Sequence, residues 1–279
     1  MNRIWKFMIS VILIIIGIIL YARFNGTMGL ETKEYAIYDK NLPSGFDGIK
    51  IVHFSDLHYK KVITEKRVKE LVSEINKINP DMVMFTGDLL DKDYTVTNSD
   101  INFLIEQLSS IKTKYGIFAV MGDNDYSNEE VVNNIYIQSD VTLLKNTSTI
   151  IYNENNEKIY IGGLDSFNKN KADINILDGY KDIDYKKILV HEGDYVDNVI
   201  SKINDVDMIL SGHSLNGSVN VLGIKNMLLP SGSKKYYKPY YKINDTDIYI
   251  SNGIGVDKVN FRLFNTPSIN FYRFDNDNY

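Results

Sequence analysis

The sequence contains no cysteine and only four histidines among 279 residues. The absence of cysteine excludes disulfides, thiolate nucleophiles and thiolate metal sites. Any metal site must therefore combine carboxylates with the few imidazoles. The sequence also lacks a long Lys/Arg stripe, and its formal net charge is -5, so we do not expect a nucleic-acid partner. We interpret the Lys- and Tyr-rich segment 234–242 as a solvated surface ribbon.

One long apolar run, residues 7–22, contains no charged side chain and is bounded by Lys6 and Arg23. As a helix it would span about 24 Å, and amphipathic flanking side chains would bring it close to a hydrocarbon core of about 30 Å. We interpret residues 1–23 as an uncleaved membrane anchor. A cleaved signal peptide is the alternative, but the residues before Arg23 form a poor cleavage pattern. The cations before the run predict a single-pass cell-membrane protein whose domain lies on the extracytoplasmic side.

The rest of the chain divides into a tether with a first strand, residues 24–45, and one domain, residues 46–279. Amphipathic helices alternate with apolar strands, and short Tyr- and Ile-rich strands follow. We expect strands at 34–38, 49–54, 81–88, 116–123, 187–194, 206–213, 218–224, 247–253, 259–264 and 268–274. We expect helices between Thr64 and Pro80, at 101–111, after a capping box of Ser127 and Glu130, and near 195–203. The polar run 165–187 is interpreted as a surface excursion. This pattern predicts an α/β fold of two packed sheets with outer helices.

Polar side chains recur directly after the predicted buried strands, where open α/β sheets place ligands. Glycines beside them, Gly87, Gly122 and Gly212, allow sharp turns. A lone Gly-Asp at a strand end is usually only a turn, but several in order favour a metal site with mixed Asp and His donors. His53 points to the opposite face of its strand and is left out. The candidates are Asp56, His58, Asp88, Asp123, His191 and His213.

This series of motifs resembles the calcineurin-like metallophosphoesterase superfamily, and its bacterial membrane-associated branch in particular. The motifs are Asp56-Leu57-His58, Gly87-Asp88, Gly122-Asp123-Asn124-Asp125, His191 and Gly212-His213, with the ending 247–274. The resemblance implies a four-layer α/β/β/α sandwich of two mixed sheets, preceded here by the transmembrane helix. It also implies two divalent ions, Mn²⁺, Fe²⁺ or Zn²⁺, that bind a water as hydroxide for in-line attack on phosphorus.

Carried over by the resemblance, Asp56 and His58 bind the first metal and Asp88 bridges both metals. Asp123, His191 and His213 complete the second site. Independently of the resemblance, we expect Asp91 and Asp125 to be caps or hydrogen-bond acceptors that support the ligand-bearing loops.

The active-site pattern is degenerate at three positions. Asp123 replaces the usual asparagine ligand and still coordinates. Asn124 replaces the histidine that assists departure of the leaving group, and an amide cannot donate a proton as imidazolium does. Leu215 stands where the first metal would take its remaining histidine. The first site is therefore weakened, which leaves open the binding of only one ion.

Two functions follow from this degenerate pattern. The first is a phosphoesterase acting on phosphomonoesters or phosphodiesters, with a phosphorylated small molecule, lipid or cell-envelope component as substrate. The second is a catalytically impaired protein, a pseudoenzyme that serves as a surface binding module. A generic membrane-tethered domain without a site is a third interpretation, which would require every motif to be a simple turn.

Overall fold

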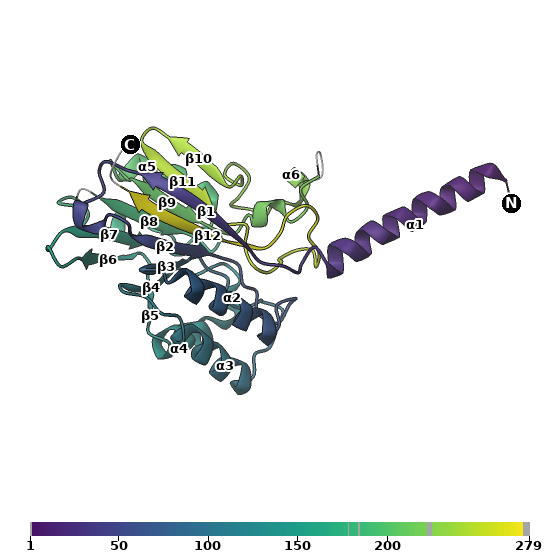
Figure 1. Ribbon diagram of the computed structural model, residues 1–279, viewed down its shortest axis with the longest axis horizontal. Coiled ribbons are helices and arrows are strands. Elements are labelled where there is room, and N and C mark those ends of the chain that lie inside the picture. Colours follow the sequence, from purple (N-terminus) through teal and green to yellow (C-terminus); the bar gives the residue numbers. More distant parts are fainter. Residues whose placement is uncertain (1, 178, 184, 222–224, 276–279) are drawn as a thin grey trace.

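The computed structural model describes residues 2–177, 179–183, 185–221 and 225–275, and in these residues two mixed, six-stranded sheets pack face to face (Figure 1). The first sheet has the order β1 (Glu31–Tyr38), β12 (Ser268–Asp275), β2 (Lys50–Phe54), β3 (Met82–Phe85), β4 (Gly116–Ala119) and β5 (Val141–Leu143). The second has the order β10 (Tyr240–Ile243), β11 (Thr246–Ile250), β9 (Met208–Ser211), β8 (Lys186–Val190), β7 (Lys158–Gly163) and β6 (Thr147–Tyr152).

Helices cover both outer faces, which confirms the predicted four-layer α/β/β/α sandwich (Figure 1). The first sheet is covered by α2 (Glu65–Ile78), α3 (Asn98–Ser109) and α4 (Glu129–Gln138), and the second by α5 (Val196–Lys202). A short α6 (Lys225–Leu228) lies near the end of α1 (Arg3–Phe24). Short 3₁₀ turns are η1 (Ser44–Phe46), η2 (Asp125–Asn128), η3 (Ile174–Ile176), η4 (Gly193–Tyr195) and η5 (Leu215–Gly217).

The central strands are buried on both faces, and this explains their unbroken apolar sequences. In β3, Val83 and Phe85 pack against the helices, while Met82 and Met84 pack into the layer between the sheets. The buried apolar residues of α2 recur at helical spacing, as predicted, and they pack in the same cluster as Val83 and Phe85. The sandwich thereby holds the ends of its strands, and the loops that follow them, on a rigid frame.

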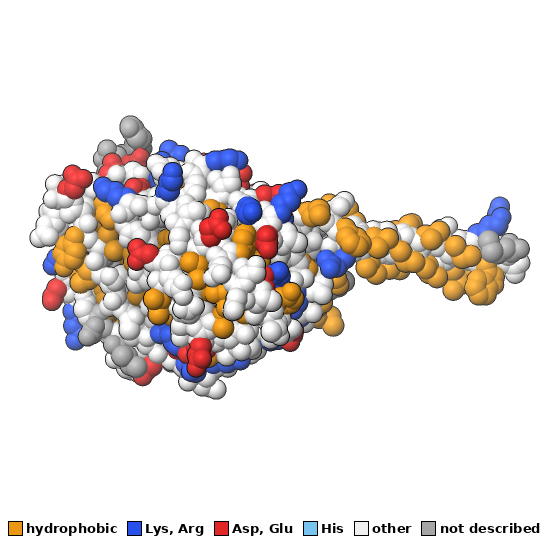
Figure 2. Space-filling model, turned by 90° about the horizontal axis from the view of Figure 1, so that it is seen from below, with side chains coloured by type: hydrophobic (Ala, Val, Ile, Leu, Met, Phe, Trp, Pro, Cys, Tyr) orange, Lys and Arg blue, Asp and Glu red, His pale blue; other side chains and the backbone are white. Residues whose placement is uncertain are grey.

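The N-terminal helix α1 stands away from this sandwich. It contains 22 residues, about 33 Å at helical rise, and Ala22 is the residue that it buries. Within the described residues it is the one helix long and apolar enough to cross a membrane, which supports the predicted anchor. Figure 2 shows its hydrophobic side chains continuing onto the adjoining end of the domain.

Two predicted strands, 218–224 and 259–264, are wrong for the residues that the structure describes; residues 222–224 lie outside that part. Only an isolated bridge between Val219 and Leu263 forms there. The backbone has φ of +55° at Ser218 and +54° at Phe264, and an extended strand cannot contain such residues.

Three smaller expectations also fail. The helix α4 begins at Glu129 with Asn128 as its N-cap, so Ser127 forms no capping box; it lies inside η2 instead. The strands β5, β6, β7 and β10 were not predicted, and β10 begins within the Lys- and Tyr-rich segment that we interpret as a solvated ribbon. The run 165–187 is not merely a surface excursion, because Ile174, Leu177 and Ile183 are buried with α5 on the outer face of the second sheet. Tyr185 is buried in the layer between the sheets.

Candidate metal centre

Six predicted site residues converge where strands of the two sheets end. Asp56 and His58 follow β2, Asp88 follows β3, Asp123 follows β4, His191 follows β8 and His213 follows β9. Asp56, Asp88, His191 and His213 each offer a ligand atom, and these atoms lie within 4.8 Å of one another. All four side chains are buried. Residues separated by up to 157 positions along the chain are thus brought to one point.

Asp88 lies in the middle of this cluster. Its Oδ2 atom is 3.5 Å from His58 Nε2 on one side and 3.3 Å from His191 Nε2 on the other. Asp123 Oδ1 lies 3.8 Å from His191 Nε2 and 3.7 Å from His213 Nδ1. On the opposite side, Asp56 Oδ1 is 3.9 Å from His58 Nε2. A carboxylate in this position can share its oxygens between two cations.

The ligand-bearing loops require unusual backbone conformations. The φ angle is positive at Asp56, His58, Asp88 and His213, which costs about 1–2 kcal/mol per L-residue. Gly87 has φ +87°, and a Cβ there would lie 2.7 Å from His191 Nδ1. Glycine is therefore required at this turn, and the other loops persist only because their surroundings hold them.

Asp125 is the main support of these loops. Its buried carboxylate accepts backbone hydrogen bonds from Asp88, Leu89 and Gly122 at 2.8–2.9 Å and from Leu90 at 3.2 Å. It therefore joins the loop after β3 to the loop after β4. We predicted a supporting role for Asp125, and these bonds show how it could perform that role.

Asn124, at the position where the resemblance implies a histidine, contacts Asp88. Its backbone N–H donates to Asp88 Oδ1 at 2.9 Å and its side-chain amide donates to Oδ2 at 2.7 Å. The amide also reaches Asp123 Oδ1 at 3.1 Å. The side chain is 3% exposed, so it orients the two carboxylates from inside the site.

The tautomers of two histidines test whether the site suits a cation. His191 Nδ1 lies 2.6 Å from the carbonyl of Thr86, and His213 Nε2 lies 2.7 Å from that of Ser231. Carbonyls only accept, so His191 Nδ1 carries a proton. His213 Nε2 also lies 3.1 Å from Asn168 Nδ2, but Asp123 and Ser231 accept the two amide hydrogens, so we assign a proton to His213 Nε2 as well. The other nitrogen of each ring then presents a lone pair. Those two nitrogens are 3.1 Å apart and face carboxylates. Such converging acceptors repel one another unless a cation or an added proton lies between them, so the donor set fits a divalent metal ion.

His58, on the other side of Asp88, also indicates that the site suits a cation. Neither of its ring nitrogens has a hydrogen-bond partner among the described residues, although both are buried. Its Nδ1 atom lies 3.5 Å from Asp91 Oδ2, which also contacts Lys61 Nζ at 3.0 Å. Burial lowers the pKa of His58, but Asp91, Asp88 and Asp56 outweigh it and raise that pKa to about 9. For His191, Asp88 and Asp123 likewise outweigh burial and raise the pKa. The site attracts positive charge.

Leu215 lies beside Asp56 and offers no ligand atom. A Cβ at Gly253 would lie 2.3 Å from Leu215 Cδ2 and 3.1 Å from Asp56 Cβ, so the two side chains meet over this glycine. Leu215 is 3% exposed and has φ +47°. An apolar side chain thus closes the side of the cluster where the resemblance implies an imidazole.

Sequence reasoning missed two residues at the centre. The Asn168 amide donates to Asp123 Oδ2 at 3.3 Å and to the Ser231 carbonyl at 2.9 Å, from a segment to which we assigned no function. Arg262 is fully buried and donates to the carbonyls of Gly253 and Gly255, beside Asp56. The sequence did contain one indication of Arg262: it is a single charged residue within the mainly apolar segment 259–264.

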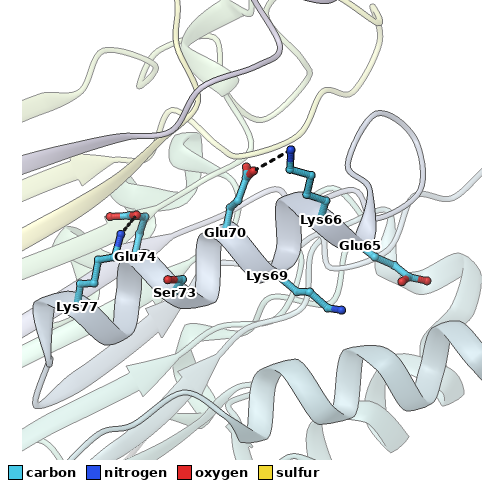
Figure 3. A pocket seen from close by; sticks show the side chains of 7 residues that line it. All are labelled: Glu65, Lys66, Lys69, Glu70, Ser73, Glu74 and Lys77. Atoms are coloured by element: carbon cyan, nitrogen blue, oxygen red, sulfur yellow. Dashed lines mark hydrogen bonds and ion pairs between the residues drawn. The ribbon is translucent and has the colours of Figure 1, made fainter.

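The hollow along the exposed face of α2 is a separate feature of the surface. Figure 3 shows Lys and Glu side chains alternating along the exposed face of this helix, with Lys66 paired to Glu70 and Lys77 to Glu74. These side chains point outward and pair along the helix instead of converging. It is a solvated helix face, and the chemistry collects at the strand ends instead.

Comparison with known proteins gives a consistent family. A family model described as calcineurin-like phosphoesterase matches residues 49–217. The uncharacterized metallophosphoesterase YkuE of Bacillus subtilis is 28% identical over 92% of this chain and 90% of its own length. A zebrafish (Danio rerio) transmembrane protein with metallophosphoesterase domain is 22% identical over 89% of this chain and 58% of its own length. The crystal structure of calcineurin-like phosphoesterase YfkN from Bacillus subtilis aligns with a TM-score of 0.47 at 14% identity, covering 74% of this chain and 81% of that one.

Proposed function

The chain belongs to the calcineurin-like phosphoesterase family, and on this premise we propose that it is a metal-dependent hydrolase of phosphomonoesters or phosphodiesters. The observation that carries the proposal is the pair of inward-facing histidine nitrogens beside Asp88, a donor set that a divalent cation would satisfy. A fold under structural demand alone has no need of buried carboxylates and imidazole lone pairs at one point.

The residues divide between two candidate ion positions. Asp56, His58 and Asp88 would hold the first ion, and Asp88, Asp123, His191 and His213 would hold the second. Bound divalent cations supply Lewis acidity, which acidifies water and offsets charge on phosphoryl oxygens. Leu215 leaves the first position with one donor fewer, so we expect its ion to bind more weakly.

The protein's own groups orient this centre. Asp125 holds the backbone on both sides of Asp88, and Asn124 holds the Asp88 carboxylate through two hydrogen bonds. Asn124 cannot protonate a leaving group as imidazolium does, and general acid catalysis is typically worth about 10²–10⁴-fold. We therefore expect esters of acidic alcohols, such as nitrophenol, to be the better substrates.

A non-catalytic binding module is the second candidate function. It is favoured by the position of Leu215, whose side chain closes the place of one ligand with hydrocarbon. In this case the second ion position alone would be occupied and the protein would bind a phosphorylated component without hydrolysing it.

The proposed location is the cell membrane, with α1 as a single-pass anchor and the domain on the extracytoplasmic side. Arg3 and Lys6 precede the apolar helix and favour retention of the N-terminus inside.

The test is the metal content per chain of full-length protein purified without chelator, with 4-nitrophenyl phosphate and bis-4-nitrophenyl phosphate hydrolysis measured under added Mn²⁺. Metal that disappears in His213→Ala, together with Mn²⁺-dependent turnover, supports the hydrolase. His53→Ala is the control, because it removes a buried imidazole outside the centre. One ion without turnover would favour the binding module, and no bound ion would refute both.

A further inference from the structure

The direction of the strands places the candidate centre at the end of the domain nearest α1. Residues 25–30 connect α1 to β1, so β1 starts at the anchor and runs away from it. The strand β12 is parallel to β1, and β2 is antiparallel to β12, so β2 runs back toward the anchor. Because β3 and β4 are parallel to β2, the loops that carry Asp56, Asp88 and Asp123 all lie at the anchor end.

Direct contacts fix α1 against that end. The Arg262 backbone N–H donates to the carbonyl of Ala22 at 3.0 Å, at the last turn of α1. Gly26 packs so closely on the Arg262 carbonyl that a Cβ at Gly26 would lie 1.8 Å from this oxygen. The helix is therefore joined to the domain by contact as well as by the chain, and the same end of the domain must lie next to the membrane that α1 enters.

Large apolar side chains are exposed on this end. Phe24 is 58% exposed, Met28 62%, Met227 of α6 79% and Phe264 73%. Phe264 also has φ +54°, a backbone conformation that is unfavourable for an aromatic residue. Exposed apolar residues gathered at one end of a domain mark a protein or membrane contact.

Cations accompany these apolar side chains. A cavity of about 400 Å³ lies between the end of α1 and the start of α2, where Phe24, Met28 and Val62 meet Arg23 and Arg67. Arg67 is paired with Glu70, which also lines this cavity, at 2.8 Å. Hydrocarbon next to Lys and Arg side chains is the composition that suits the boundary between acyl chains and anionic headgroups. Figure 2 shows Lys and Arg side chains around this junction.

We propose that this end of the domain, defined by Phe24, Met28, Met227 and Phe264, lies in the headgroup region of the bilayer that α1 spans. The centre then works at the membrane surface, and its substrate class is the phosphate ester of a membrane lipid. This second statement rests on the proposed hydrolase function, whereas the position of the surface does not.

The membrane-facing residues are joined to the centre on both sides. Two residues before Phe264, the Arg262 guanidinium donates to backbone carbonyls within residues 252–255, next to Asp56. Directly after Phe264, the Asn265 amide donates to the carbonyl of Leu215. The helix α6, which carries Met227, leads directly to Ser231, whose carbonyl accepts the His213 N–H. A lipid headgroup at this surface therefore lies next to the loops that carry the ligands.

The first experiment measures contact with lipid. Trp5, the single tryptophan, is replaced by Phe in the full chain, and Phe264→Trp or Met227→Trp supplies the probe. The protein is reconstituted in phosphatidylcholine–phosphatidylglycerol vesicles with or without brominated acyl chains. We expect both tryptophans to emit at shorter wavelength and to lose most of their fluorescence to the brominated lipid. Ile137→Trp on α4 is the matched control, because it is equally exposed at 79% and belongs to the outer helical layer.

Emission from positions 264 and 227 that equals the control and is not quenched would overturn the proposal. A shift to shorter wavelength without quenching by lipid would also overturn it, since a second copy of the chain would then cover the surface. Neither readout requires activity, so each is independent of the proposed function.

The second experiment addresses the substrate class. Phe264→Asp should lower hydrolysis of phosphatidic acid, added as a third lipid to these vesicles, by about tenfold, because the apolar contact of the Phe264 ring with the bilayer is lost. It should lower hydrolysis of soluble 4-nitrophenyl phosphate far less, so the ratio of the two rates is the measurement, and an unchanged ratio would contradict the role of Phe264 in reaching the lipid. Turnover of the soluble ester with no turnover of the lipid by the unmodified chain would refute the lipid substrate. No turnover of either ester, with quenching intact, would refute the proposed hydrolase and retain the membrane surface.

Discussion

At position 215 a leucine in the left-handed region of backbone space closes one side of the centre. We predict that Leu215→His increases the metal content per chain and lowers the metal Kd by about tenfold or more, because even outer-shell partners of metal ligands are worth about 10–100-fold. Histidine tolerates positive φ better than leucine does, so the backbone should accept the change. Metal analysis and Mn²⁺ titration measure it.

Leu215→Met is the matched control for this prediction. It keeps an apolar side chain of similar volume and adds no imidazole. If metal affinity rises equally in both variants, the effect comes from packing, and position 215 is not a ligand position.

Asn124 allows a second prediction at the scale of one residue. Asn124→His should raise kcat for phenyl phosphate by about tenfold or more, and for 4-nitrophenyl phosphate by much less, because only the poorer leaving group needs a proton. The substitution also removes the hydrogen bond that the Asn124 side-chain amide donates to Asp88 Oδ2, so part of the gain in kcat is offset. The ratio of the two rates is the measurement, and an unchanged ratio would contradict the assigned role.

At the scale of elements, the loops after β3 and β4 depend on one carboxylate. Asp125→Ala leaves four buried N–H groups without their acceptor and should lower the free energy of unfolding by about 3 kcal/mol or more. It should also lower the bound metal, because the clamped loops carry Asp88 and Asp123. Denaturant unfolding and metal analysis of the same sample check both effects.

Asp207→Ala separates these two effects. Asp207 is buried and accepts a hydrogen bond from the Lys186 N–H at 2.7 Å, so its loss also destabilises the protein. Asp207 precedes β9, at the end of the strand opposite to His213, and metal content should stay unchanged. Equal metal loss in both variants would mean that Asp125 acts through general stability alone.

Elements with a strong local pattern were predictable, and contacts between distant segments were not. The runs at 49–54 and 206–213 read as strands because they are apolar and end in polar turns. The segment 259–264 has the same composition, but Arg262 bonds to carbonyls of residues 252–255, and positive φ at Phe264 ends any extended run. Whether such a segment forms a strand depends on tertiary packing, which cannot be read from a short stretch of sequence.

The same limit applies to the centre. The sequence placed aspartates and histidines at strand ends, and the folded chain brings them together. Asn168 escaped notice because its partners Asp123 and Ser231 are 45 and 63 residues away. The roles of these residues as ligands remain predictions that metal binding tests.

At the scale of the whole molecule, the layer between the sheets contains a buried lysine at the end opposite to the centre. Lys187 is fully buried at the start of β8, and its Nζ atom lies 4.1 Å from the ring centroid of Phe274 and 4.3 Å from that of Tyr185. Asp207, Asp39 and Asp247 favour its charged form. Desolvation is the larger effect, and it lowers the pKa of Lys187 from 10.5 to about 7.

This pKa shift makes the stability of the whole domain depend on pH. Between pH 7 and 10.5 the unfolded chain keeps the proton that folded Lys187 has released, so the free energy of unfolding rises with pH in that window. Below pH 7 both states are protonated and the full cost of burying the charge remains. Lys187→Met should therefore stabilise the protein by up to about 5 kcal/mol near pH 7, since one pKa unit corresponds to about 1.4 kcal/mol.

The advantage of Lys187→Met should shrink steadily toward pH 10, where unmodified Lys187 is already neutral in the folded state. Denaturant unfolding of the full chain in detergent micelles, repeated across this range for both proteins, measures the difference. Exposed Lys202→Met is the control and should show no such trend. A constant advantage of Lys187→Met at every pH would mean that the methionine merely packs better, and that the buried amine carries no charge cost within the sandwich.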